Sequence, residues 1–331
     1  MKKIAVIGAG GWGTALAILL SEQGLPIALW GHEKGHVDEI NRSRANNVFL
    51  PGVVLPENIT ATNSMADAVD ADLIVIVPPS KAMRSVASQL ASAQPRPETP
   101  LLSCTKGIEL HSGLLMTQII QEALPQNPVA ALSGPSHAEE VSRKAPAAVV
   151  LGCADQVIAK QLQLIFSTPN FRAYTSEDVT GIELGGALKN IFAIGAGICD
   201  GLGLGDNTKA AFVTRALAEL IRLGVALGGK RETFQGLSGI GDLMVTCFSR
   251  HSRNRGVGER LGKGETLEQI SGSMAMVAEG VPTTLSAFEC ARKLGVATPI
   301  VDQIHAILYE NKSPRSATME LLNRDPRPEE D

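Results

Sequence analysis

The N-terminal stretch Ile4-Ala-Val-Ile-Gly-Ala-Gly-Gly-Trp-Gly-Thr-Ala-Leu16 decides the fold. A short β-branched run precedes the glycines, which fit the pattern G-x-G-x-x-G, and helical periodicity follows them. In this pattern Gly8 permits a tight turn, Gly10 lets the backbone approach a pyrophosphate, and Gly13 allows close packing of helix on strand. Amides at the helix N-terminus would hold the phosphates. The stretch therefore predicts a dinucleotide-binding turn; a plain strand-to-helix turn is the alternative.

The same stretch also resembles a signal peptide, because Lys2 and Lys3 precede an uncharged segment that extends to Leu20. Four glycines interrupt that segment, and no small-residue cleavage site precedes Ser21. We therefore favour the dinucleotide-binding interpretation. No other segment is long and apolar enough to suggest an integral membrane span.

Strand-like and helix-like segments alternate through the first half of the chain. Near-continuous apolar strands separated by helices predict a parallel sheet covered on both faces. The expected strands are residues 3–7, 27–30, 73–77, 101–104, 129–132 and 148–151, and the expected helices are residues 14–23, 81–90 and 115–124.

The pattern changes near residues 176–180, after which helical periodicity continues and strand-like runs are absent. The expected helices are residues 181–198, 208–227, 283–294 and 300–310. We therefore expect an α/β dinucleotide-binding domain over 1–179 and an all-α substrate domain over 180–324. The charged, proline-interrupted tail 325–331 is expected to be disordered.

Composition agrees with two folded domains and limits the partners. At roughly 150 residues per domain, a chain of 331 residues suggests two. The net charge of −4 argues against a non-specific nucleic-acid binder, which needs a basic surplus. The five cysteines are scattered without metal-ligand spacing, so we expect no metal and a reducing, cytoplasmic compartment.

The end of the second predicted strand bears on the choice of cofactor. An NAD-preferring site normally places an acidic residue there to bind the ribose hydroxyls. The sequence runs Leu29-Trp-Gly-His-Glu-Lys34, with Gly31 where the acid is expected and His32 and Lys34 nearby. This environment favours NADP(H), and Glu33 keeps NAD(H) open. The alternative is that these residues form a solvated loop.

Lys106 follows a predicted central strand within Cys104-Thr-Lys-Gly107. The carboxyl ends of such strands face the crevice where open α/β sheets bind ligands. Lys106 is therefore a candidate site residue, although a solvated loop lysine is the alternative.

Lys189 is the stronger anomaly, because it is the single charge in the segment Leu184–Gly197. A helix through this segment is apolar nearly all round and therefore buried. A buried ammonium needs a carboxylate, an anionic ligand or a lowered pKa. Desolvation, or a second cation such as Lys106, would bring its pKa into the catalytic range. A structural ion pair with Glu183 or Asp242 is the alternative.

Three further clusters carry polar groups suited to a ligand. Asp242 is a lone carboxylate in the apolar, glycine-flanked Gly239-Ile-Gly-Asp-Leu243. Ser252-Arg-Asn-Arg255 offers hydroxyl, guanidinium and amide donors for a phosphate or carboxylate, unless it is a solvated basic loop. Gly134-Pro-Ser-His137 follows another strand, and we expect His137 to be a satisfied loop histidine rather than an acid/base.

With these motifs in order, the sequence resembles the bacterial NAD(P)-dependent glycerol-3-phosphate dehydrogenase family over essentially its whole length. The motifs are Ile7-Gly-Ala-Gly-Gly-Trp-Gly-Thr-Ala-Leu16, Phe49-Leu-Pro-Gly52, Cys104-Thr-Lys-Gly107, Ser133-Gly-Pro-Ser136, Leu184-Gly-Gly-Ala-Leu-Lys-Asn190, Gly239-Ile-Gly-Asp242 and Ser252-Arg-Asn254. The resemblance implies reduction of dihydroxyacetone phosphate to sn-glycerol 3-phosphate, a phospholipid precursor. It also implies a Rossmann-type domain followed by a helical domain like that of 6-phosphogluconate dehydrogenase, which often supports a homodimer.

The resemblance adds site residues to the Gly8, Gly10 and Gly13 of the glycine pattern. For the cofactor it implies Gly11, Trp12, His32, Lys106, Ala138, Arg253, Val277 and Glu279. For the substrate it implies Lys106, Gly134, Ser136, Lys189, Asp242, Ser252, Arg253 and Asn254. Family members often carry serine at Gly11, where contact would be through the backbone.

Both lines of reasoning join in one mechanistic hypothesis with Lys189, Lys106 and Asp242 as catalytic residues. Lys189 supplies the proton to the developing alkoxide, Lys106 stabilises its charge and Asp242 orients Lys189. Arg253 with Asn254 fixes the phosphate. The alternatives are a related two-domain dehydrogenase of a 3-hydroxy acid and a non-catalytic protein that binds nicotinamide nucleotides.

Overall fold

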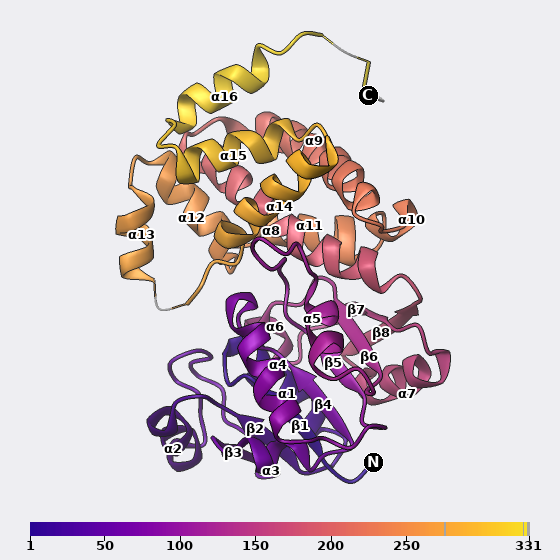
Figure 1. Ribbon diagram of the computed structural model, residues 1–331. Helices are drawn as coiled ribbons and strands as arrows, with labels where there is room; N and C mark the ends of the chain where they lie inside the picture. The colour runs from indigo at the N-terminus through magenta and orange to yellow at the C-terminus, as the bar shows by residue number, and fades with distance from the viewer. Residues whose placement is uncertain (275, 327, 330–331) are drawn as a thin grey trace.

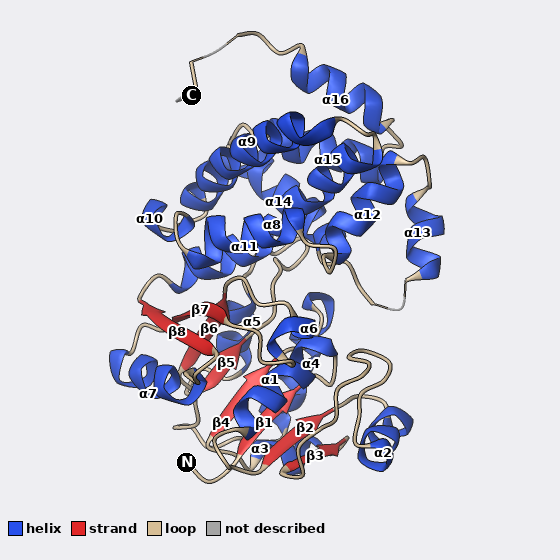
Figure 2. Ribbon diagram, turned by 180° about the vertical axis from the view of Figure 1, so that it is seen from behind, coloured by secondary structure: helices blue, strands red, loops and turns tan. Residues whose placement is uncertain are grey.

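The computed structural model describes residues 1–274, 276–326 and 328–329. Strands and short helices form the N-terminal half, and a bundle of helices forms the C-terminal half (Figure 1). The view from behind shows the strands confined to the N-terminal half, with helices on both sides of the sheet (Figure 2).

An eight-stranded sheet organises the described N-terminal half, in the order β3-β2-β1-β4-β5-β6-β7-β8. Its strands are β1 (Ile4–Ile7), β2 (Ile27–Trp30), β3 (Ile59–Thr62), β4 (Leu73–Ile76), β5 (Leu101–Ser103), β6 (Val129–Ser133), β7 (Ala147–Gly152) and β8 (Phe171–Ser176). Neighbouring strands are parallel except β6 and β7, which pair antiparallel. The expectation of a parallel sheet is thus wrong at this one pair. Ligand is expected at the switch point where β1 lies between β2 and β4.

The strands are apolar throughout because both faces of the sheet are covered. In β1, Ile4 and Val6 join the hydrophobic cluster beneath α1 (Gly11–Ser21) and α7 (Gln156–Phe166), whereas Ala5 and Ile7 join the cluster beneath α4 (Met83–Ser92) and α5 (Met116–Ala123). The helices of this half are α1 (Gly11–Ser21), α2 (Lys34–Ser43), α3 (Met65–Val69), α4 (Met83–Ser92), α5 (Met116–Ala123), α6 (Ala138–Val141) and α7 (Gln156–Phe166), with a short 3₁₀ turn η1 (Ser80–Ala82) before α4.

Every regular element described after Ser176 is helical. The helices are α8 (Val179–Gly201), α9 (Gly205–Ala226), α10 (Arg231–Phe234), the π-helical segment η2 (Leu237–Gly241), α11 (Asp242–Phe248), α12 (Arg253–Gly262), α13 (Leu267–Ser273), α14 (Gly280–Leu294), α15 (Pro299–Tyr309) and α16 (Pro314–Leu322). Helix α8 is long and apolar enough to cross a membrane, but here it is the buried core helix, with its best apolar window wholly enclosed.

The sequence predicts the position of these elements better than their ends, and it misses two strands. Strand β3 is short and half exposed, with threonines facing outward, and β8 carries exposed Arg172 and Tyr174. Neither forms a continuous apolar run, so neither produced a buried-strand signal. Helix α1 begins at Gly11 rather than near Thr14, because the helix includes the glycines that the prediction assigned to the turn.

The sequence also made predictions about the cysteines and the C-terminal tail. All five cysteines lie in the described part and are free; four are buried, and Cys290 is half-buried. In the tail, residues 327, 330 and 331 lie outside the described residues, so the expectation of disorder there is not addressed. The described tail residues contain neither helix nor strand.

Candidate active site

The glycine turn has the shape that a dinucleotide phosphate group requires. Gly8 has φ of +126°, and a Cβ there would lie 2.7 Å from the carbonyl oxygen of Val77. A Cβ on Gly13 would collide with the carbonyl of Gly8, so helix and strand can meet only without it. Around Gly10, by contrast, there is open space, and its missing side chain leaves the N-terminus of α1 without a side-chain cap. These residues therefore fit a nicotinamide dinucleotide, with free amides aimed at its phosphates.

At the end of β2, packing explains why no acidic residue stands at the expected ribose position. Gly31 is buried, and a Cβ there would lie 2.9 Å from Val37 and 3.2 Å from Ala9. His32 and Lys34 are exposed, and Lys34 opens α2. The exposed His32, Glu33 and Lys34 therefore follow Gly31, the position where an acidic residue would repel a 2′-phosphate.

Lys106, Lys189 and Asp242 meet at one point between the two halves of the molecule. The Nζ of Lys106 donates to Oδ2 of Asp242 at 2.5 Å and to the carbonyl of Gly134 at 3.2 Å. The Nζ of Lys189 donates to Oδ1 of Asp242 and, at 2.7 Å, to Oγ1 of Thr246. An ammonium has three donors and the described contacts use two on each lysine. One N–H per lysine therefore remains for a substrate oxygen.

Local structure holds each of these three groups in place. Lys189 projects from the middle of α8, and Asp242 is the first residue of α11, which follows the π-helical segment η2. Helix α8 approaches Lys106 closely because Gly186 has no side chain; a Cβ there would lie 3.4 Å from Cγ of Lys106 and collide with Ser133. The apolar turn expected around Asp242 is thus the π-helical entry to α11.

Burial and opposing charges set the protonation of the cluster. Desolvation, reinforced by the neighbouring Lys106, lowers the pKa of Lys189 to about 7 although Asp242 opposes the shift. Burial alone would raise the pKa of Asp242, but the charges and hydrogen bonds of Lys106 and Lys189 together lower it. The carboxylate stays ionised, and Lys189 can hold or release a proton near neutrality.

The two alternatives for the lysines are resolved by this geometry. Lys106 is half-buried and paired with Asp242, so it is not a solvated loop lysine. Lys189 does form the ion pair with Asp242, whereas Glu183 lies elsewhere on α8 and accepts from the backbone and hydroxyl of Thr117. The ion pair therefore exists, and it belongs to a cluster with spare donors.

The loop after β6, in the N-terminal half, contacts the cluster of Lys106, Lys189 and Asp242 through the carbonyl of Gly134. Gly134 has φ of +136°, its carbonyl accepts from Lys106, and Oγ of Ser136 also donates to that carbonyl at 3.0 Å. His137 occupies the N-cap position of α6 without a capping hydrogen bond from its side chain, and its buried Nε2 has no hydrogen-bond partner in the described structure. The expectation of a satisfied loop histidine is therefore wrong.

Ser252, Arg253 and Asn254 form the start of α12 rather than a solvated loop. Oγ of Ser252 accepts from the amide of Arg255 and so caps the helix. Arg253 is exposed, and its guanidinium donates to the carbonyl of Val277 at 2.8 Å. Asn254 is buried and links α12 to α8 and α14, donating to Asn190 and accepting from Gly280. Arg253 thus retains more free donors than Asn254.

The segment before α14 reaches back to the nucleotide-binding half. The carboxylate of Glu279 accepts from the amide of Ser80 at 3.0 Å and also from its hydroxyl. Ser80 opens the turn η1 after β4, next to the strand that carries the glycine turn. Trp12 and Ala138, on α1 and α6, pack half-buried against the same hydrophobic cluster. Glu279 therefore connects the helical half to the half that carries the glycine turn.

Sequence reasoning missed three residues that this site uses. Thr246 lies one helical turn after Asp242 and accepts from Lys189, Asn190 holds Asn254, and Ser80 binds Glu279. The spacing of four residues between Asp242 and Thr246 was the one available signal, because such residues share a helix face.

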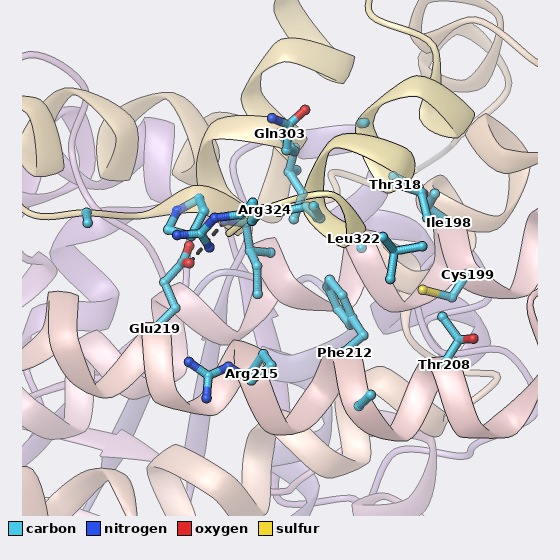
Figure 3. A pocket seen from close by; sticks show the side chains of 18 of the residues that line it. Ile198, Cys199, Thr208, Phe212, Arg215, Glu219, Gln303, Thr318, Leu322 and Arg324 are labelled. Carbon is cyan, nitrogen blue, oxygen red and sulfur yellow. Dashed lines mark hydrogen bonds between the residues drawn. The ribbon is translucent and has the colours of Figure 1, made fainter. Parts of the chain in front are cut away.

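A separate cavity of about 780 Å³ lies between α8, α9, α15 and α16. Phe212, Ile198 and Leu322 surround its apolar part, and Arg215, Glu219 and Gln303 lie toward the other end (Figure 3). None of the residues predicted for the cofactor or substrate lines it.

Comparison with known proteins now adds to this geometry. The family model described as NAD-dependent glycerol-3-phosphate dehydrogenase N-terminus matches residues 3–159, and the corresponding C-terminus model matches residues 178–319. Glycerol-3-phosphate dehydrogenase [NAD(P)+] of Geobacter sulfurreducens is 48% identical over 98% of both chains. The same-named protein of Listeria monocytogenes is 47% identical over 98% of this chain and 96% of its own.

Solved structures agree with the sequence comparisons. The glycerol-3-phosphate dehydrogenase of Coxiella burnetii superposes with a TM-score of 0.94 at 38% identity, covering 98% of this chain and 99% of that one. The Saccharomyces cerevisiae glycerol-3-phosphate dehydrogenase gives a TM-score of 0.83 at 28% identity over 98% and 99% of the two chains. The chain therefore belongs to the NAD-dependent glycerol-3-phosphate dehydrogenase family.

Proposed function

We propose that the chain reduces dihydroxyacetone phosphate to sn-glycerol 3-phosphate with NAD(P)H, and catalyses the reverse oxidation. The observation that carries the proposal is the cluster of Lys106, Lys189 and Asp242, in which each lysine keeps one free donor. Relatives named glycerol-3-phosphate dehydrogenase match nearly the whole chain. They favour this function over the two alternatives, a 3-hydroxy acid dehydrogenase and a non-catalytic nucleotide binder.

The chemistry divides between the cofactor and the chain's own side chains. When bound, the nicotinamide nucleotide supplies the hydride for the ketone carbon. Lys189, which can hold a proton near neutrality, donates the proton of its remaining N–H to the ketone oxygen as negative charge develops there. Lys106 places a second positive charge beside that oxygen, and Asp242 holds both ammonium groups on one side of it.

The phosphate of the substrate is assigned to the start of α12. Arg253 carries five N–H donors, of which the described contacts use one, toward Val277. Its exposed guanidinium therefore suits a dianionic phosphate. Ser252 and Asn254 fix the position of Arg253 through the helix cap and the bond to Gly280.

The nucleotide would lie across the crevice, and NADP(H) is the preferred form in our proposal. The amides at Gly11 and Trp12 face its phosphates, whereas His32 and Lys34 lie where a 2′-phosphate would sit. Both side chains are exposed and therefore accessible to the nucleotide.

Three wider features belong to the same proposal. The chain acts as a cytoplasmic enzyme, it forms a homodimer, and the division between its domains falls at residues 179/180. The change from β8 to α8 between Ser176 and Val179 supports the division, and the free cysteines support a reducing compartment.

Spectrophotometry of NAD(P)H oxidation tests the function directly. The purified chain is mixed with NADPH or NADH and with dihydroxyacetone phosphate, 2-oxo acids or 3-oxo acids. We expect turnover of dihydroxyacetone phosphate alone, and a higher kcat/KM with NADPH than with NADH. Turnover of an oxo acid in its place would refute the assignment of substrate, and equal use of both nucleotides would refute the preference.

A further inference from the structure

The histidine in the loop after β6 has a ring nitrogen that the fold leaves unused. Nε2 of His137 is buried, and the described residues offer it no hydrogen-bond partner. Burying a polar nitrogen without a partner destabilises the fold, so such an atom in a native site calls for an explanation. A ligand that enters the site is the simplest source of the missing partner.

His137 lies close to the reaction centre. The charges of Lys189, Asp242 and Lys106 all act on its ring. It is the residue after Ser136, whose hydroxyl shares the Gly134 carbonyl with Lys106. His137 therefore belongs to the loop that contacts the lysine cluster through the carbonyl of Gly134.

The second half of the molecule closes around the same ring. The ring of His251, in the connection between α11 and α12, lies 5.9 Å from that of His137 at an angle of 54°. His251 directly precedes Ser252, which caps α12. The His137 ring thus contacts the segment that leads into α12, whose first residues are assigned to the substrate phosphate.

The chemistry of the ring indicates which part of the substrate it meets. Burial, together with the charge of Lys189, lowers the pKa of His137, so the imidazole is neutral at neutral pH. A neutral imidazole suits an uncharged hydroxyl, whereas a phosphate dianion is matched by the cationic Arg253. Dihydroxyacetone phosphate has one uncharged polar group besides its ketone, the hydroxyl on C1.

We propose that His137 is a specificity-determining residue whose Nε2 hydrogen-bonds the C1 hydroxyl of the substrate. This inference rests on the proposed function, because it names a contact to dihydroxyacetone phosphate. A site with a buried polar atom discriminates strongly against a substrate that lacks the matching group, since the atom then stays unpaired.

A pair of substrates tests the contact. Hydroxyacetone phosphate keeps the ketone and phosphate of dihydroxyacetone phosphate but has a methyl group in place of the C1 hydroxymethyl. For the wild-type enzyme we expect kcat/KM to be at least about tenfold higher for dihydroxyacetone phosphate, the value of one hydrogen bond. In His137→Phe the value for dihydroxyacetone phosphate should fall about tenfold, and that for hydroxyacetone phosphate should stay within about twofold.

Further arms separate recognition from structure. His137→Gln retains an amide that can bond a hydroxyl, so part of the discrimination should return; it also serves as the test variant if the Phe variant does not fold. A loss shared equally by both substrates, or no loss with either, overturns the proposal. If the wild-type chain does not reduce dihydroxyacetone phosphate at all, the proposed function itself fails, which is a distinct result.

Discussion

Asp242 and Glu219 are two buried carboxylates with almost the same exposed fraction, but their pKa values are shifted in opposite directions. Asp242 is 1% exposed, contacts two ammonium groups, and has a pKa below its usual value. Glu219 is 2% exposed and accepts from the backbone amides of Ile300 and Val301 at 3.0 and 2.8 Å. Burial raises the pKa of Glu219 to about 7. The difference shows that the charge of the partners, rather than burial, decides which carboxylate stays ionised.

The same contrast separates the working part of the molecule from its framework. Glu219 caps the N-terminus of α15, and Glu183 binds the N-terminus of α5. Burial also raises the pKa of Glu183 to about 7. Both bind backbone amides at a helix N-terminus, and Glu183 also accepts from the hydroxyl of Thr117. The Asp242 cluster concentrates full charges in one place, as a site that must stabilise a developing anion requires. Four predictions follow this contrast from its strongest consequence to its weakest.

Removing a cation from the ionised carboxylate should have the largest effect. We expect Lys189→Ala to lower kcat by at least about 10³-fold, because the proton donor is lost, while the Kd for NADPH stays within a few-fold. Stopped-flow kinetics and nucleotide titration by fluorescence measure the two quantities. Lys209→Met is a matched control, because Lys209 is also a buried lysine paired with a carboxylate, that of Asp200. It should lose stability and keep most of its kcat; near-normal turnover in Lys189→Ala would refute the assigned role.

Neutralising the carboxylate itself should have the next largest effect. In Asp242→Asn the two ammonium groups lose their shared counter-charge, and we expect kcat to fall about 10²-fold. Because Asp242 raises the pKa of Lys189, its loss should also move the pH profile of ketone reduction to lower pH. Rates measured from pH 5 to 9 provide both results. An unshifted profile would mean that Asp242 does not act through Lys189.

The pH dependence of the wild-type enzyme should be opposite in its two directions. Reduction needs protonated Lys189, so its kcat should fall as pH rises through about 7, whereas oxidation of glycerol 3-phosphate needs neutral Lys189 and should rise. At pH values well above 7 the reductive rate should drop about tenfold per unit. Initial rates in both directions on one enzyme preparation test this. A reductive rate that is flat up to pH 9 would exclude Lys189 as the titrating acid.

The framework carboxylate should affect stability alone, and least of the four. The pKa of Glu219 is higher in the folded chain than its ordinary 4.5, so its contribution to stability is complete below pH 4.5 and is lost as pH rises to about 7. Glu219→Gln should remove this part of the pH dependence of unfolding while leaving kcat within about twofold. Urea unfolding at pH 5 and pH 7.5, compared with wild type, measures it. An equal fall in stability for both proteins would contradict the raised pKa.

The sequence predicts one side of this contrast well and the other poorly. Lys189 could be found because it is the single charge between Leu184 and Gly197, where an apolar helical segment predicts burial. The glycine turn could be found because its spacing is fixed by local backbone geometry. Both signals lie within about twenty residues of sequence, which is the range over which periodicity can be read.

What could not be predicted depends on contacts between distant segments. The carboxylate of Glu219 binds the start of α15. The carboxylate of Glu279 binds Ser80, which lies 199 positions earlier in the chain. The antiparallel pairing of β6 with β7 likewise depends on how the chain turns after α6. The orphaned nitrogen of His137 is visible only once the surrounding side chains are in place. Such features are properties of the packed molecule, and no local pattern records them.

The proposed proton donor lies inside the buried helix α8, whereas the residues proposed to select the substrate lie at the starts of two other helices. Lys189, the proposed proton donor, sits in a helix whose residues from Gly181 to Cys199 are all buried, so moving that role elsewhere would require rebuilding the hydrophobic interior. The groups assigned to the two ends of the substrate, His137 and Arg253, occupy the caps and first turns of α6 and α12 instead. Substitutions there disturb little else. Evolution, or an engineer, can thus alter which ketone is accepted while the means of reducing it is inherited unchanged.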